Sequence, residues 1–409
     1  MRFLHERLPN GLDVVAEVGD TALSTSLGFF VATGARDESD TVRGVSHFLE
    51  HMVFKGTPRI SGDEINRRFD AMGAGANAFT SEEDTVYYAS VLPERQAEAV
   101  ELLAAMMRPA LRTEDFDTEK LVILEEIRMY DDQPPFGADD RCRAAFFGGH
   151  PLGGNVLGTI DSITALAADA MRDYHRRRYA PDTMVLAASG AVDFPALVES
   201  ARRLCGDWAP QGEAARLGPP PAPAAVRQGI ERIVRPAATL DYAVAMVAGP
   251  GERHADRYAA RLLATLLGDS SGSRLYWSLV DTGEAEHASL QHHDFLDAGL
   301  FVTQLSCEAA DVEPLLRRIA GVYGEARTAI GTAEFERARN KLASRVVLGG
   351  EKPLRRLFDL GLEWSHSRTY RSIAETLRRV ESLERGDIDR VLHEWPLDGP
   401  AATVIAGRG

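Results

Sequence analysis

The segment of residues 44–57, GVSHFLEHMVFKGT, restricts what the chain can be more than any other part of the sequence. Ser46 is a candidate N-cap, and a glycine and a proline follow the apolar part of the segment, so the pattern predicts a helix. On a helix, His47 and His51 stand at positions i and i+4, and both imidazoles project from one face, where they can bind a single metal ion. Glu50 lies along the same edge, within reach of a water molecule on that ion. We therefore expect a metal site on this helix.

A second predicted helix, over residues 114–130, offers a third ligand. Helical spacing places Glu119 and Glu126 on one stripe, because seven residues are close to two turns. Glu125 lies about 100° away from that stripe and is expected to face solvent. Glu126 is the better ligand, and Glu119 is a candidate partner behind the ligands, with an ordinary ion pair as the alternative. Two histidines at this spacing also occur by chance, but the inserted glutamate and the matching third ligand favour a metal site.

The order H-x-x-E-H is the inverted form of the H-E-x-x-H signature of zinc peptidases. With the downstream glutamates, it makes the sequence resemble the pitrilysin/insulinase family, in particular its short two-domain members that are similar to mitochondrial processing peptidase. The family's H-x-x-E-H motif and distant glutamate are matched by His47, Glu50, His51 and Glu126, and its E-(x)6-E spacing by Glu119 and Glu126. The resemblance covers essentially the whole chain and includes residues 34–38 (GARDE), 77–80 (NAFT) and 178–181 (RYAP).

Three protein ligands with one open position are typical of a catalytic rather than a structural zinc site. We expect one zinc ion (Zn2+) per chain, bound by His47, His51 and Glu126, with a water molecule in the fourth position. Glu50 is expected to act as the general base that takes the proton of this water and passes it to the leaving amine. We place Glu119 beside Glu50 in the catalytic set. The resemblance implies a zinc metalloendopeptidase that hydrolyses short or unfolded peptides.

Residues 73–80 and 85–90 are predicted to form two strands with a polar turn between them. The first is rich in glycine and alanine, so another backbone can lie close against it. An exposed edge next to a zinc ion can hold an extended peptide by main-chain hydrogen bonds. Because this stretch also matches the family's substrate-binding edge strand, the resemblance implies that Asn77, Ala78 and Phe79 bind the substrate. An ordinary hairpin is the alternative.

A proline-rich stretch, residues 208–225, is predicted to link a zinc-binding catalytic domain, 1–207, to a second domain, 226–409. Short segments of the second half echo the first half at similar offsets, which indicates a duplicated fold: 332–335 echoes 113–116, and 383–388 echoes 166–171. The second copy has no histidine pair near residues 257–268. The expected fold class is α+β, with two homologous domains, each a mainly antiparallel sheet packed with helices.

The second domain departs from the family in one respect. Members that act alone carry there an arginine and a tyrosine seven residues apart, which contact the substrate and the oxyanion. Val280 and Glu286 stand at these positions here. Some enzymes of the family divide the work between a zinc-bearing subunit and a homologous zinc-less subunit that supplies the arginine and tyrosine. The resemblance thus implies the catalytic subunit of a heterodimer, with a homodimer as second choice. The competing class is a non-catalytic structural subunit of a larger complex, against which the intact zinc set argues.

Composition excludes other classes of partner. The formal charge of −15 and the pI of about 5.3 argue against binding to nucleic acid or to an anionic membrane. The 3 cysteines show no C-x-x-C spacing, which argues against a disulfide framework and fits a reducing compartment. The first residues lack the apolar stretch of a signal peptide, and no apolar run approaches the length of a membrane span. We therefore expect a cytoplasmic protein.

Overall fold

The computed structural model describes residues 1–210, 229–399 and 401–408. Contacts divide the described residues into two compact units. Of the described residues, unit 1 contains 1–128, 154–210 and 348–371, and unit 2 contains 129–153, 229–347, 372–399 and 401–408. Each unit thus includes one segment from the other half of the sequence. The predicted ranges, 1–207 and 226–409, do not include this exchange of segments. The predicted linker, 208–225, lies from residue 211 onward outside the described residues.

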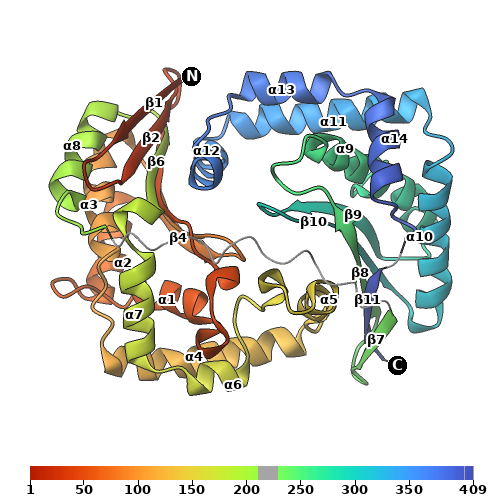
Figure 1. The fold of residues 1–409 in the computed structure, drawn as a ribbon, viewed down its shortest axis with the longest axis horizontal. Coiled ribbons are helices and arrows are strands. Elements are labelled where there is room, and N and C mark those ends of the chain that lie inside the picture. The colour runs from red at the N-terminus through yellow and green to blue at the C-terminus, as the bar shows by residue number, and fades with distance from the viewer. Residues whose placement is uncertain (211–228, 400, 409) are drawn as a thin grey trace. The chain divides into compact units, whose positions relative to one another are not determined.

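Unit 1 contains a 6-stranded sheet in the order β1-β2-β6-β3-β5-β4 (Figure 1). Neighbouring strands are antiparallel except for β2 and β6, which are parallel. The strands are β1 (Arg2–Arg7), β2 (Asp13–Val18), β3 (Thr25–Val31), β4 (Gly75–Thr80), β5 (Thr85–Val91) and β6 (Met184–Gly190). The glycine- and alanine-rich strand β4 is therefore an edge strand, as the sequence predicted.

Helices cover both faces of this sheet, because side chains on a strand alternate between its faces. Phe29 belongs to the core on one face and the adjacent Phe30 to the core on the other. The first face carries α1 (Val45–Val53), α2 (Gly62–Met72), α3 (Gln96–Met106), α4 (Thr113–Asp132), α6 (Ile160–Ala165), α7 (Ala168–Arg178) and α8 (Phe194–Cys205).

The second face is covered by α12 (Pro353–Ser367), which comes from the distant segment 348–371. Leu357, Leu360 and Trp364 of α12 pack there against valines and Phe30 of the sheet. A Cβ atom built on Gly361 would lie 2.3 Å from the ring of Phe30, so this close approach requires glycine.

Unit 2 repeats this architecture with a 5-stranded sheet in the order β7-β11-β8-β10-β9. The pair β7 and β11 is parallel, as β2 and β6 are in unit 1, and the other pairs are antiparallel. Its strands are β7 (Gly229–Val234), β8 (Asp241–Gly249), β9 (His287–Asp294), β10 (Gly299–Cys307) and β11 (Ala402–Gly407). Its helices are α5 (Ala138–Phe147), α9 (Arg257–Gly268), α10 (Val312–Ala326), α11 (Thr332–Gly350), α13 (Ile373–Glu381) and α14 (Arg385–Glu394). The predicted α+β fold with two homologous, mainly antiparallel domains is confirmed.

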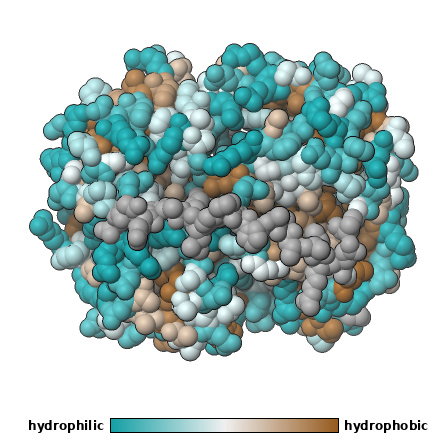
Figure 2. Space-filling model, in the orientation of Figure 1, coloured by the Kyte–Doolittle hydropathy of each residue, from teal (hydrophilic) through white to brown (hydrophobic). Residues whose placement is uncertain are grey.

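The surface drawn in Figure 2 is mostly hydrophilic, with hydrophobic residues scattered over it. Such scattered apolar residues are ordinary on protein surfaces. No helix within the part of the chain that the structure describes has the length and apolar character needed to span a bilayer.

The start of α1 differs from the prediction. Its N-cap is Gly44, with a φ of 86°, rather than Ser46, which lies inside the helix. The carboxylate of Glu38 accepts hydrogen bonds from the N–H groups of Gly44 and Ser46, each at 2.7 Å, and so caps the helix from a preceding loop. Burial raises the pKa of Glu38 to about 7, although these N–H groups favour the ionised form. Ser46 instead bonds through its hydroxyl to that of Tyr174 at 2.7 Å.

Replacing Glu38 by alanine is therefore expected to lower the free energy of unfolding by about 2 kcal/mol, because two buried N–H groups lose their acceptor. Urea unfolding of the variant measures this loss. Asp40 is the matched control: its side chain is 90% exposed and pairs only locally with Arg43. We expect Asp40→Ala to stay within about 0.5 kcal/mol of the wild type. Equal stability of the two variants would contradict the capping role of Glu38.

Candidate metal centre and active site

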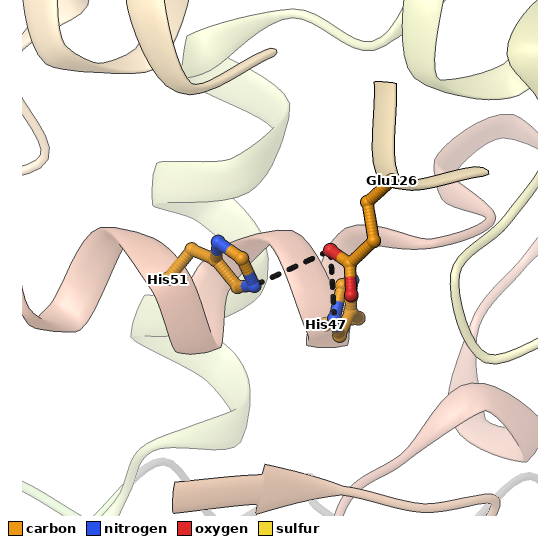
Figure 3. Close-up of side chains that lie close together, drawn as sticks. All are labelled: His47, His51 and Glu126. Atoms are coloured by element: carbon orange, nitrogen blue, oxygen red, sulfur yellow. Dashed lines mark ion pairs between the residues drawn. The ribbon is translucent and has the colours of Figure 1, made fainter. Parts of the chain in front are cut away.

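The candidate metal ligands come from two helices of unit 1. On α1, Phe48, Leu49 and Met52 are buried in the core, which fixes the rotation of the helix about its axis. His47 and His51 project together from another side, with ring centroids 4.8 Å apart. Glu126 projects toward them from α4 (Figure 3). The spacing of the residues along both helices thus brings three potential ligands to one point.

The three ligand atoms lie at distances that suit one ion. Oε2 of Glu126 is 3.7 Å from Nε2 of His47 and 3.6 Å from Nε2 of His51. Ligands of one tetrahedral zinc ion are expected roughly 3.3–3.6 Å apart, from bond lengths of about 2.0–2.2 Å. Oε2 of Glu126 is also buried without a hydrogen-bond partner among the described residues. A buried carboxylate oxygen that faces two imidazole nitrogens needs a cation, so these residues fit zinc.

Burial and the neighbouring charges shift the pKa values of all three candidate ligands. Burial, assisted by the nearby His51, lowers the pKa of His47 to about 4, so this imidazole is neutral, as a ligand must be. Burial would also lower the pKa of His51, but its hydrogen bond with Glu119 and the charges of Glu126 and Glu50 raise it overall. Burial raises the pKa of Glu126, against the attraction of His51. Burial therefore disfavours the charged forms of these side chains, and a bound cation offsets this cost for the Glu126 carboxylate.

Glu119 lies behind His51 and is almost completely buried. Its Oε1 is 2.9 Å from Nδ1 of His51, and its Oε2 is 2.5 Å from Nζ of Lys55. Burial would raise the pKa of Glu119, but these two hydrogen bonds hold it below its usual value. The carboxylate thus accepts the Nδ1 proton of His51 and directs Nε2 toward Glu126.

Sequence reasoning missed Lys55, which lies just beyond Phe54, the C-cap of α1. Glu119 does not belong to the group formed by His47, His51 and Glu126; it contacts that group through Nδ1 of His51. Glu125 is exposed, as the helical spacing predicted, and pairs with Arg128.

We expect Glu119→Ala to weaken zinc affinity by about 10–100-fold, the usual effect of losing the carboxylate behind a ligating histidine. Competition with a chromogenic chelator measures this affinity. Glu125→Ala, on the next residue stripe of the same helix, removes an equal charge from an exposed position and serves as control. If both variants bind zinc with the same affinity, Glu119 affects zinc binding only through its charge.

Glu50 faces the same site but belongs to no ligand group. Its Oε2 accepts a hydrogen bond from the hydroxyl of Thr80, on the edge strand β4, at 2.7 Å. Burial raises the pKa of Glu50, an effect that the Thr80 hydrogen bond and His51 reduce. A carboxylate with a raised pKa beside a metal site is suited to proton transfer.

The three residues predicted to bind substrate lie on β4, with different orientations. The carboxamide oxygen of Asn77 accepts a hydrogen bond from the N–H of Ala78 at 2.8 Å. The side chain of Ala78 packs in the core on the side of α1. The ring of Phe79 lies on the opposite face, 5.6 Å from the ring of Phe358 of α12. The ring of Phe79 is therefore engaged in packing against α12.

Unit 2 has no equivalent centre among its described residues. The helix α9 carries no histidine. A grouping of His254, Asp256 and Glu394 exists, but Arg390 binds the carboxylate of Asp256 through two nitrogens and so supplies its positive charge. Val280, at the end of a π-helical turn, packs against the core of unit 2, and Glu286 is exposed.

Comparisons with known proteins show the family to which the chain belongs. Residues 13–160 match the insulinase family (peptidase family M16), and residues 165–342 match the peptidase M16 inactive domain. A Mycobacterium tuberculosis protein named an uncharacterised zinc protease is 34% identical over 413 residues, which cover 98% of this chain and 92% of that protein. The mitochondrial-processing peptidase subunit beta of Caenorhabditis elegans is 27% identical over 415 residues, covering 98% and 89%.

The fold agrees as well. The crystal structure of a protease from Helicobacter pylori superposes with a TM-score of 0.91 over 99% of both chains, at 22% identity. The site geometry, the two domain matches and the relatives named zinc proteases lead to one conclusion. The chain belongs to the insulinase family of peptidases, M16.

Proposed function

We propose that the chain is a zinc-dependent endopeptidase that hydrolyses short or unfolded peptides, with Glu50 as the general base. The observation that carries this proposal is the division of roles among four side chains at one point. His47, His51 and Glu126 gather around the unpaired carboxylate oxygen. Glu50 lies beside them, outside the ligand group, and is held by Thr80.

When bound by His47, His51 and Glu126, one zinc ion per chain supplies a Lewis acid that makes a water molecule more acidic and polarises a peptide carbonyl. Glu50 accepts the proton of the attacking water and then donates it to the nitrogen of the leaving amine. Glu119 keeps His51 in the tautomer and orientation that ligation needs. The edge of β4 around Asn77 and Ala78 holds the peptide backbone in an extended form.

We propose further that the chain is the catalytic subunit of a heterodimer with a homologous zinc-less subunit, and that a homodimer is the alternative. Val280 and Glu286 occupy the positions where self-sufficient relatives carry arginine and tyrosine, so unit 2 lacks these groups for substrate and oxyanion. The similarity to a processing peptidase subunit supports the same assignment. The three cysteines are buried and free, which supports a reducing compartment such as the cytoplasm.

The test is cleavage of a quenched fluorescent peptide mixture by the purified, zinc-loaded chain, with Glu50→Gln purified in parallel as blank. Chelation should abolish cleavage, and added zinc should restore it. Activity of the chain alone would refute the need for a different subunit. Activity only after addition of a zinc-less homologue would support the heterodimer. Absence of cleavage in both cases, with a full equivalent of zinc bound, would overturn the endopeptidase proposal in favour of a non-catalytic subunit.

A further inference from the structure

Thr80 connects the edge strand to the proposed general base. It is the last residue of β4, and its hydroxyl donates to Oε2 of Glu50 on α1 at 2.7 Å. Because side chains alternate along a strand, Thr80 points to the same face of the sheet as Ala78, toward α1. This hydrogen bond joins two elements that lie 30 residues apart in the sequence.

The bond matters because a glutamate side chain has several rotatable bonds. The terminal carboxylate torsion is broad, so packing alone does not hold it in one orientation. The Thr80 hydroxyl engages one oxygen, Oε2, whereas Oε1 makes no hydrogen bond within the described residues. Oε1 is therefore the oxygen left free to accept a proton.

We propose that Thr80 is a positioning residue for Glu50: its hydroxyl holds the carboxylate so that Oε1 faces the reacting water. This proposal rests on the proposed function. Thr80 directly follows the segment of β4 proposed to pair with the peptide. The same strand therefore sets the place of the substrate backbone and the orientation of the base, which fixes the distance between them.

Two variants distinguish the effect of the Thr80 hydroxyl from the effect of the shape of its side chain. Thr80→Val keeps the branched shape and removes the donor, and Thr80→Ser keeps the donor and removes the methyl group. With Thr80→Val we expect kcat to fall by about 10²-fold, as misplaced catalytic groups commonly cause, and KM to change by less than about 3-fold. Thr80→Ser should retain kcat within about 3-fold. Equal loss in both variants, or a rise in KM in place of the fall in kcat, would overturn the proposal.

The Glu50→Gln background provides a readout that does not depend on turnover. If Thr80 acts only through the base, Thr80→Val should leave the peptide affinity of the Glu50→Gln protein unchanged, as measured by fluorescence anisotropy of a labelled peptide. Weaker binding in the double variant would make Thr80 a substrate contact instead.

Crystal structures of the zinc-loaded variants separate this inference from the proposed function. We expect the Glu50 carboxylate to keep its orientation in Thr80→Ser and to rotate in Thr80→Val. An unchanged Glu50 in Thr80→Val refutes the positioning role even if the variant is slow. Conversely, a wild-type protein that shows no peptidase activity either alone or with a zinc-less homologue refutes the proposed function, while the two structures still decide whether Thr80 orients Glu50.

Discussion

Replacing Glu50 by glutamine is expected to lower kcat for peptide cleavage by about 10²–10⁴-fold while zinc stays bound, because general bases contribute factors of this size. The amide oxygen of glutamine can still accept the hydrogen bond of Thr80, so the side chain keeps its place. An amide cannot take a proton from water at neutral pH. The three ligands His47, His51 and Glu126 are not altered, and the zinc content should remain that of the wild type.

His51→Ala is the contrasting variant. It removes a ligand and leaves Glu119 without its histidine partner, so both zinc and activity should be lost. Zinc content by atomic absorption and initial rates at saturating peptide distinguish the two effects. Substantial turnover of Glu50→Gln would show that another group takes the proton, whereas loss of zinc from Glu50→Gln would make Glu50 a ligand.

The parts of the site that follow from local spacing could be predicted from the sequence. Helical periodicity alone placed His47 and His51 on one face and separated Glu126 from Glu125, and the structure has these orientations. The glycine- and alanine-rich composition of residues 73–80 likewise indicated the edge strand. Which residues share a face of a helix is decided within that helix, so the 3.6-residue period carries this information.

The features that depend on distant partners could not be predicted. The cap of α1 comes from Glu38, in a preceding loop, so the local signal of Ser46 was misleading. Phe79 lies on the substrate strand, but its ring packs under α12, a helix distant in sequence. The sequence analysis also missed the assignment of 348–371 to unit 1. The apolar face of an amphipathic helix indicates that the helix packs against another element, but it does not identify that element.

The segment 348–371 also leads to the largest expected effect on stability. Arg356 of α12 donates from Nε to Oε2 of Glu17 on β2 at 2.6 Å, and the two side chains are only 6% and 1% exposed. Tyr370 donates to the other oxygen of Glu17 at 2.8 Å. Arg356→Ala leaves the Glu17 carboxylate buried without its cation. We expect the free energy of unfolding of unit 1 to fall by about 3–5 kcal/mol in urea.

Two comparisons test whether the buried charge is the cause. Arg355 is the neighbouring arginine of α12, but its side chain is 64% exposed and pairs with Asp359, so Arg355→Ala should cost less than about 1 kcal/mol. The double variant Arg356→Met, Glu17→Met removes both charges and should recover most of the lost stability. A loss of about 1 kcal/mol should remain, because the hydroxyl of Tyr370 loses its acceptor. If the double variant is as unstable as Arg356→Ala, the loss comes from packing of α12 on the sheet. If the double variant instead recovers most of the loss, the buried ion pair contributes little net stability compared with an apolar pair, and the instability of Arg356→Ala comes from the unpaired carboxylate.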